Sequence, residues 1–339
     1  MTSVATAQEY QQLHPPAGLV IRKFDYSDTD YANFVAVGNR IYPEYPDTVA
    51  EYRHFDQALP AHLKRCRWLA EHNGQVVGYA SYGQFEDMYH PQLFHISVAV
   101  LPEAQSQGIG TALYQTVCTT LKPFDPLRLR ARTRADYATG LRFVQRLGYR
   151  EDMREWESRL EIAQFDPIPY AGHEERVVAS GIRIATLAEL IQEDPNHRRK
   201  LYELDLELAL DVPHPEPQTT FSYETFVHNV FAAPNLIPEG YFVALDGETY
   251  AGISALWRSQ AETDCFYTGL TGVRRAYRRR GIALALKLRA LAYAQRQGVR
   301  IVKTWNESNN RPMLSINEQL GFVKQPAWIS FVKTLAEEA

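Results

Sequence analysis

The chain has 339 residues, of which 45% are hydrophobic and 22% charged, and its net charge at pH 7 is −4. These values are ordinary for globular domains and argue against extended disorder, and the acidic balance argues against a general nucleic-acid binder. The sequence has no apolar run of about 18 residues and no basic start followed by an apolar core, so we expect no membrane span and no signal peptide.

The length predicts about two domains. Three cysteines, Cys66, Cys118 and Cys265, lie far apart and lack the spacing of a metal site. We therefore expect unpaired thiols in a reducing, cytoplasmic setting, and no bound metal.

The first half of the chain predicts alternating strands and helices. Asn73-Gly74, between two apolar runs, is a strong signal for a two-residue hairpin turn. Apolar residues recur every four positions from Ile109 to Leu121, which predicts an amphipathic helix. In chain order we expect a polar leader at 1–17, strands at 19–22, 68–70, 75–79 and 93–100, the helix, a strand at 127–130, a helix ending at 147–149 and a strand around Trp156.

The second half repeats this order around the turn Asp246-Gly247. It predicts strands at 182–184, 241–244, 250–253 and 265–273, a helix at 282–297, a strand at 299–305 and a helix ending at 320–322. We expect two units, at 18–163 and 181–339, joined by a linker at 164–180 that contains Pro167 and Pro169. Strands that alternate with helices place both units in the mixed α/β class.

Three landmarks show that the second unit is a copy of the first. Gly281 follows Gly108 by 173 residues (281 − 108), in a glycine-containing turn that precedes each long helix. The same offset separates the hairpin glycines (247 − 74) and the glycines of the two Leu-Gly-aromatic triplets (321 − 148). We therefore interpret the chain as a tandem repeat of one α/β unit.

The glycine turn of each copy suits a pyrophosphate. The first turn of a helix presents free N–H groups and the positive end of the helix dipole. Gly108 and Gly281 remove a side chain where a phosphate must approach the backbone, and Gly110 and Ala283 keep the next position small. Five nearby arginines either pair with phosphate oxygens or form an ordinary solvated face: Arg274, Arg275, Arg278, Arg279 and Arg280.

The two turns carry a more specific pattern. Residues 105–110 read Q-x-x-G-x-G and residues 278–283 read R-x-x-G-x-A, and the segment 310–322 begins with asparagine and closes in Leu-Gly-Phe. This combination resembles the acyl-CoA loop and late helix of GNAT acetyltransferases, over nearly the whole chain. The resemblance implies an α/β fold of two tandem GNAT-like domains. Each domain would hold a mixed, mostly antiparallel sheet with a splayed strand pair, flanked by helices.

The resemblance also implies acetyl-CoA as the acyl donor. Pantetheine would lie against the splayed strands at Val98 and Val100 in the first copy, and at Thr271 and Val273 in the second. Backbone amides would hold the pyrophosphate at Gln105, Ser106, Gln107, Gly108, Ile109 and Gly110, and at Arg278, Arg279, Arg280, Gly281, Ile282 and Ala283. Two asparagines, Asn306 and Asn310, match further cofactor positions, with a simple strand end as the alternative interpretation of Asn306.

Both copies depart from the family at the catalytic positions. Where many GNAT enzymes hold an acid tyrosine, this chain has Val144 and Asn317. Where some hold a glutamate base, it has Phe94 and Tyr267. Tyr267 and Asn317 are therefore the catalytic candidates, with a core aromatic as the alternative interpretation of Tyr267. The first copy has Tyr137 and Thr133 where the second has the two asparagines, so the second copy matches better.

The region between first strand and hairpin builds the acceptor site in this family. In the second copy it contains Asp205, Glu207 and Asp211, which suit a cationic amine unless they are only solvated surface. We therefore expect an N-acetyltransferase for a small, cationic amine, with catalysis in the second copy. The alternative is a non-catalytic CoA-binding sensor or scaffold. We expect no nucleic-acid or membrane partner, and two fused copies favour a monomer.

Overall fold

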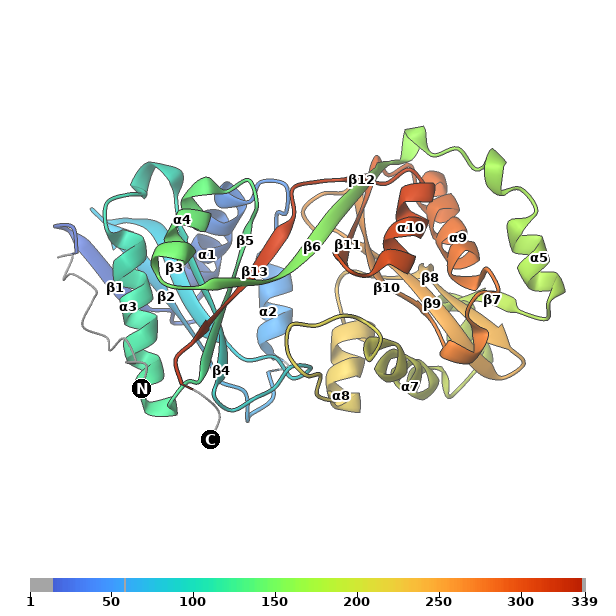
Figure 1. The fold of residues 1–339 in the computed structure, drawn as a ribbon, viewed down its shortest axis with the longest axis horizontal. Helices are drawn as coiled ribbons and strands as arrows, with labels where there is room; N and C mark the ends of the chain where they lie inside the picture. Colours follow the sequence, from blue (N-terminus) through green and yellow to red (C-terminus); the bar gives the residue numbers. More distant parts are fainter. Residues whose placement is uncertain (1–14, 58, 337–339) are drawn as a thin grey trace.

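The computed structural model describes residues 15–57 and 59–336. Two lobes lie side by side along the long axis of the molecule, each a twisted sheet with helices packed on it (Figure 1). Among the described residues the strands form one 13-stranded sheet, in the order β1-β2-β3-β4-β5-β13-β6-β11-β10-β9-β8-β7 with β12 beside β6. None of the helices in this part of the chain is long and apolar enough to cross a membrane.

The first repeat follows the expected order of elements. Its elements are β1 (Leu19–Lys23), α1 (Asp28–Ile41), α2 (Val49–Gln57), β2 (Arg65–His72), β3 (Gln75–Gly83), β4 (Leu93–Val100), α3 (Ile109–Leu121), β5 (Arg128–Arg134), α4 (Ala138–Arg146) and β6 (Arg150–Glu161). Short 3₁₀ turns η1 (Pro102–Ala104) and η2 (Lys122–Phe124) flank α3. The expected leader lies almost wholly outside the described residues.

The second repeat has one α-helix before its first strand and three α-helices between its first and second strands. Its elements are α5 (His173–Ala179), β7 (Arg183–Thr186), α6 (Leu187–Glu193), α7 (His197–Ala209), α8 (Tyr223–Phe226), β8 (Leu236–Asp246), β9 (Thr249–Arg258), β10 (Cys265–Val273), α9 (Ile282–Gln297), β11 (Ile301–Glu307), α10 (Arg311–Gln319), β12 (Val323–Lys324) and β13 (Trp328–Thr334). A π-helix, η5 (Val227–Phe231), continues α8, and the 3₁₀ turn η6 (Arg275–Tyr277) precedes α9.

The two hairpin turns occur where the sequence predicts them. Asn73 and Gly74 have φ values of 52° and 80° between β2 and β3, and Gly247 has a φ of 57° between β8 and β9. Positive φ at these positions is what a tight hairpin turn requires. The expected tandem α/β fold is thereby confirmed.

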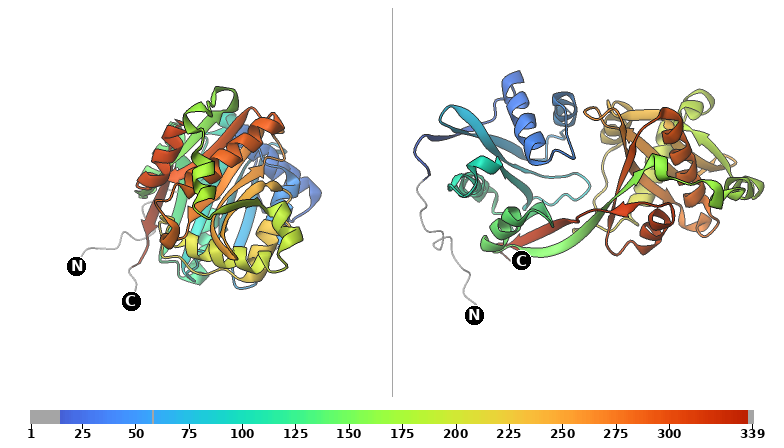
Figure 2. Two further views of the ribbon diagram at one scale, coloured as in Figure 1. Left: turned by 90° about the vertical axis from the view of Figure 1, so that its right-hand side faces the viewer. Right: turned by 90° about the horizontal axis from the view of Figure 1, so that it is seen from above.

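The repeats exchange their last strands, which the sequence analysis did not foresee. β13, the last strand of the chain, lies between β5 and the first half of β6, and its Ile329 and Phe331 belong to the core of the first repeat. The second half of β6 pairs with β11 and β12 and places Leu160 in the core of the second repeat. Figures 1 and 2 show β6 and β13 running between the lobes. The segments 18–163 and 181–339 therefore each complete the other's sheet.

The expected linker at 164–180 contains a helix that packs on the second repeat. Glu174 of α5 forms an ion pair with Arg289 of α9. The His173 Nε2 atom lies 3.0 Å from the carbonyl oxygen of Gly281. The connection between the repeats is therefore anchored beside the second glycine turn.

Candidate acyl-CoA and acceptor site

The two central parallel strands of the second repeat separate. β10 pairs with β11 from Cys265 to Tyr267, opposite residues 301–303, and not beyond. At this point β10 also bulges, because its register with β9 shifts by one residue between Thr268 and Thr271. Gly269 sits in the bulge, where an added Cβ would lie 2.2 Å from Trp257 Nε1, so no larger residue fits. A bulge leaves backbone groups out of the ladder and re-aims them.

A cavity of about 410 Å³ covers this opening. It is lined by β10 residues 268–271, β11 residues 304–307, Asn310 and Met313 of α10, and Lys287 of α9. The opposite wall comes from α7 and the loop that follows it, at 205–221. Three predicted cofactor positions, Thr271, Asn306 and Asn310, therefore meet at one cavity.

The glycine turns of both repeats have the same backbone shape. Ser106 and Arg279 have φ values of 62°, and Gly108 and Gly281 have φ values of 87° and 79°. Each glycine is the N-cap of the following helix, α3 or α9. Successive N–H groups in such a turn form a concave anion site, so the predicted pyrophosphate loops have a suitable backbone in both repeats.

The first side chain of each motif binds the protein rather than pointing to solvent. Gln105 Nε2 donates to the Val100 carbonyl at 3.0 Å, and Arg278 Nε donates to the Val273 carbonyl at 3.0 Å. Arg278 also pairs with Asp211. These side chains hold the loop against the preceding strand, and Arg279 is exposed.

Only one of the three predicted acceptor carboxylates reaches the cavity. Asp205 lines it, and burial raises the pKa of this carboxyl to about 6. Glu207 instead pairs with Arg274, and Asp211 pairs with Arg275 and Arg278. The structure therefore places Glu207 and Asp211 beside the arginines that precede α9, and neither of them lines the cavity.

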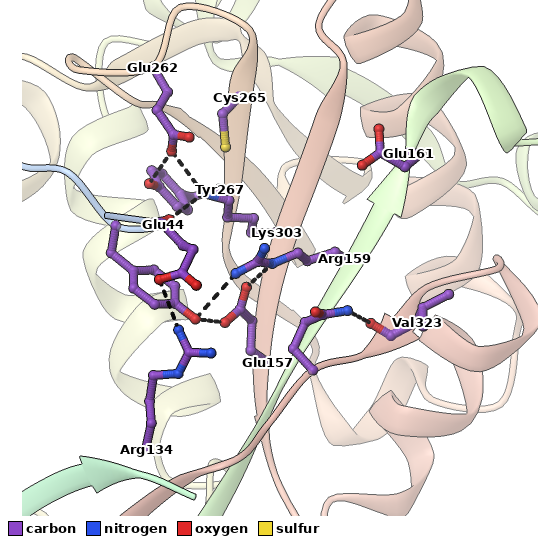
Figure 3. Close-up of polar contacts among 12 residues, drawn as sticks. Glu44, Arg134, Glu157, Arg159, Glu161, Glu262, Cys265, Tyr267, Lys303 and Val323 are labelled. Atoms are coloured by element: carbon purple, nitrogen blue, oxygen red, sulfur yellow. Dashed lines mark hydrogen bonds and ion pairs between the residues drawn. The ribbon is translucent and has the colours of Figure 1, made fainter. Parts of the chain in front are cut away.

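Neither catalytic candidate lines the cavity. Figure 3 shows Tyr267 directed toward Glu262, with its hydroxyl 3.4 Å from Glu262 Oε2. Its ring packs on Trp305 at 5.6 Å between centroids, and burial raises the pKa of its hydroxyl. Asn317 is fully buried, and its Nδ2 donates to Asn306 Oδ1 at 2.6 Å. Asn317 thus orients a cavity residue, and Tyr267 belongs to a network on the other side of β11.

That network joins the two repeats near a second, polar cavity of about 400 Å³. Lys303 Nζ donates to the Glu44 carbonyl at 2.7 Å and to Glu262 Oε2 at 2.8 Å. Glu44 also pairs with Arg134 at 3.1 Å (Figure 3). The loop after α1 is therefore attached to β11 of the other repeat.

The first repeat supplies part of the cavity lining, which sequence reasoning missed. Asp87 and Glu155 line the cavity although they belong to the first repeat. Thr219 donates from its backbone N–H to the Asp87 carbonyl at 2.8 Å and accepts from the Tyr89 N–H at 2.9 Å. Burial raises the pKa of Asp87. No local pattern in the sequence signals a contact between positions this far apart.

Lys287 is the other functional candidate that the sequence analysis missed. It lies on the buried face of α9 and lines the cavity, with 3% of its surface exposed. The only available signal was a charged residue on the apolar face of a predicted helix, between Leu286 and Leu291.

The corresponding region of the first repeat differs. β4 keeps an unbroken register with β3 from His95 to Val100, so it has no bulge. Tyr137, at the position of Asn310, stacks on Tyr42 at 5.3 Å and donates to the Ile41 carbonyl at 2.8 Å. Among the described residues no group of His, Cys, Asp or Glu is arranged to hold a metal ion.

Comparison with known proteins finds similarity to acetyltransferases in both repeats of the chain. The model of the acetyltransferase (GNAT) family matches residues 34–149 and 198–322. A mycothiol acetyltransferase from Catenulispora acidiphila is 24% identical over 273 residues, which cover 78% of this chain and 79% of that protein.

Two solved structures share the fold over almost their full length. A tandem GNAT protein from the clavulanic acid biosynthesis pathway has a TM-score of 0.73 at 17% identity and covers 95% of this chain and 100% of its own. A GCN5-related N-acetyltransferase from Sphaerobacter thermophilus has a TM-score of 0.68 at 19% identity, with coverages of 96% and 98%. Similarity at this identity establishes a shared tandem fold.

Proposed function

The chain belongs to the GNAT family of acetyltransferases, and we propose that its second repeat transfers acetyl from acetyl-CoA to a small, cationic amine. One observation carries the choice of repeat: the strand separation of β10 and β11 coincides with a bulge and a cavity of about 410 Å³. The similarity to a mycothiol acetyltransferase supports a small-molecule acceptor.

The glycine turn at 278–283 and the bulge would hold the donor. The turn amides would bind the pyrophosphate, and pantetheine would lie along Thr271 in the gap between the strands. Gly269 and Leu270 have no Cα partner of their own in the register with β9. An amide of this bulge would stabilise the oxyanion that forms on the acetyl carbonyl.

Asp205 would bind the acceptor and take its proton. An ammonium group must lose a proton before its nitrogen can attack a thioester. Burial raises the pKa of Asp205 to about 6, which brings the carboxylate close to the working pH of a general base. Asp87, which lines the same cavity, adds a second acidic group for a cation.

Thiol release from acetyl-CoA with a panel of primary amines tests this proposal. We expect release with at least one amine, and about 100-fold lower kcat/KM in Asp205→Asn because the base is lost. Glu203→Gln is the matched control, since Glu203 lies two residues away on α7 and is exposed. Absence of amine-dependent thiol release would favour the non-catalytic CoA-binding alternative.

A further inference from the structure

Lys287 is a buried cation without a counter-ion. Its side chain extends from α9 into the cavity, and within residues 15–57 and 59–336 it forms no ion pair and no hydrogen bond. Its Nζ lies 5.5 Å from the centre of the Phe322 ring. Burying a lysine in this way is unfavourable unless a ligand or a reaction uses the charge.

The charges around the cavity do not neutralise this lysine. Five titratable groups line the same cavity: Asp87, Glu155, Asp205, His214 and Glu307. Burial alone lowers the pKa of Lys287 to about 8, so none of the five contributes appreciably to the shift.

Two of these carboxylates already have partners. Glu155 pairs with Arg132, and Glu307 accepts from the Asn309 backbone N–H at 2.7 Å. The ammonium group of Lys287 is therefore available to a ligand in the cavity.

Lys287 reaches the cavity from α9, which packs on one face of the sheet, whereas Asp205 reaches it from α7, which packs on the other face. Thr271 of β10 and Thr304 of β11 line the same cavity on either side of the gap. Lys287 faces the ring of Phe322. The Phe322 backbone N–H donates to the Asn317 carbonyl at 3.0 Å. A thioester lying in the gap between the strands would therefore have Lys287 on one face of the sheet and Asp205 on the other.

We propose that Lys287 is the general acid that protonates the departing CoA thiolate, a role that rests on the acetyl transfer proposed above. The neutral amine of the acceptor attacks the acetyl carbonyl and forms the C–N bond, which leaves an oxyanion on the carbonyl oxygen. The C–S bond then breaks as the carbonyl forms again. The electron pair of the C–S bond remains on sulfur, which takes a proton from the Lys287 ammonium. The nitrogen of the new amide loses its second proton to solvent, and the neutral lysine regains one from solvent. Asp205 releases to solvent the proton that it took from the acceptor ammonium.

The first repeat lacks this group. The position 173 residues before Lys287 (287 − 114) is Tyr114, whose hydroxyl lies 3.5 Å from the hydroxyl of Tyr149. A tyrosine side chain carries no positive charge, and burial raises the pKa of Tyr114, so this position stays neutral. The contrast agrees with catalysis in the second repeat alone.

The pH dependence of kcat in Lys287 variants tests the proposal. In the parent protein kcat should fall as the pH rises through about 8, because the ammonium form is the acid. Lys287→Met should lower kcat about 100-fold, at the lower end for general catalysis because a thiolate leaves readily, and should lose this basic limb. Lys287→Arg keeps the charge but does not donate a proton at neutral pH, so it should be impaired to a similar degree.

Three results would overturn the proposal. If Lys287→Arg restores kcat to near the parent value, the lysine acts through its charge and not as a proton donor. If Lys287→Met keeps an active enzyme with an unchanged basic limb, the acid is elsewhere and the proposed function still stands. A parent protein that releases no thiol with any amine would refute the proposed function and this inference together. Acetyl-CoA binding by each variant and Lys324→Met, an exposed lysine on β12, serve as controls for folding and for non-specific loss of charge.

Discussion

Buried charges hold the loop after α7, at 210–222, to the first repeat. Arg130 of β5 and Glu216 have side-chain exposures of 5% and 4% and form an ion pair. Arg130 also pairs with Asp152 and donates to the Pro215 carbonyl at 2.8 Å. These contacts fix the loop after α7 against the first repeat, where it forms the cavity wall. The sequence does not distinguish Glu216 from other acidic residues of the segment, because its partner Arg130 lies 86 positions away.

Removing the charge of Glu216 should therefore lower the stability of the folded protein. Glu216→Gln keeps the size of the side chain but leaves Arg130 buried with one carboxylate fewer. We expect the free energy of unfolding to fall by about 3 kcal/mol, as for other broken buried pairs. Urea denaturation measures this loss. A change below about 0.5 kcal/mol, the range of ordinary surface substitutions, would show that the pair does not anchor the loop.

His95 should make the stability depend on pH. Burial and the nearby Arg130 guanidinium lower the pKa of His95 from 6.5 to about 4. Between these values the unfolded chain binds more protons, so this contribution is complete above pH 6.5 and is lost as the pH falls toward 4. The slope contributed should approach about 1.4 kcal/mol per pH unit. Urea midpoints of His95→Phe should show a shallower dependence than the parent; equal slopes would assign the effect to other groups.

At the scale of elements, local patterns predicted where the strands lie in the sequence, but not which strands pair in the sheet. The hairpin glycines and the alternation of strand and helix are local features, so the order of elements and the glycine turns followed from the sequence. The exchange of β6 and β13 did not follow from the sequence. Both segments carry apolar residues that suit either sheet, and their pairing depends on strands far away in the sequence. Ile329 packs in the first core and Leu160 in the second, a choice that no local pattern encodes.

The strand exchange predicts how fragments behave. A fragment of residues 18–163 lacks β13, so β5 and β6 lose the strand between them and the core loses Ile329 and Phe331. We expect it to be aggregated or largely unfolded by circular dichroism. A fragment of the same residues joined through a flexible linker to 326–336 should fold cooperatively. Equal stability of the two fragments would contradict a structural role for the exchanged strand.

At the scale of the whole molecule, the two copies of one unit differ in structure around the cavity. Both glycine turns keep the same backbone shape, yet the bulge in β10 and the buried Lys287 belong to the second repeat. The first repeat contributes Asp87 and Glu155 to the acceptor wall. Sequence reasoning identified the turns because their motif is contiguous. It could not identify the full acceptor wall, because that wall is assembled from both repeats.

The most direct test of this account is kcat/KM for acetyl-CoA in matched variants of the two glycine turns. Aspartate tolerates positive φ better than most residues and adds a charge that repels phosphate, and asparagine is its neutral control. We predict that Gly281→Asp lowers kcat/KM at least tenfold more than Gly281→Asn, whereas Gly108→Asp and Gly108→Asn remain within about threefold of each other. Loss of activity in Gly108→Asp, with Gly281→Asp equal to Gly281→Asn, would contradict catalysis in the second repeat.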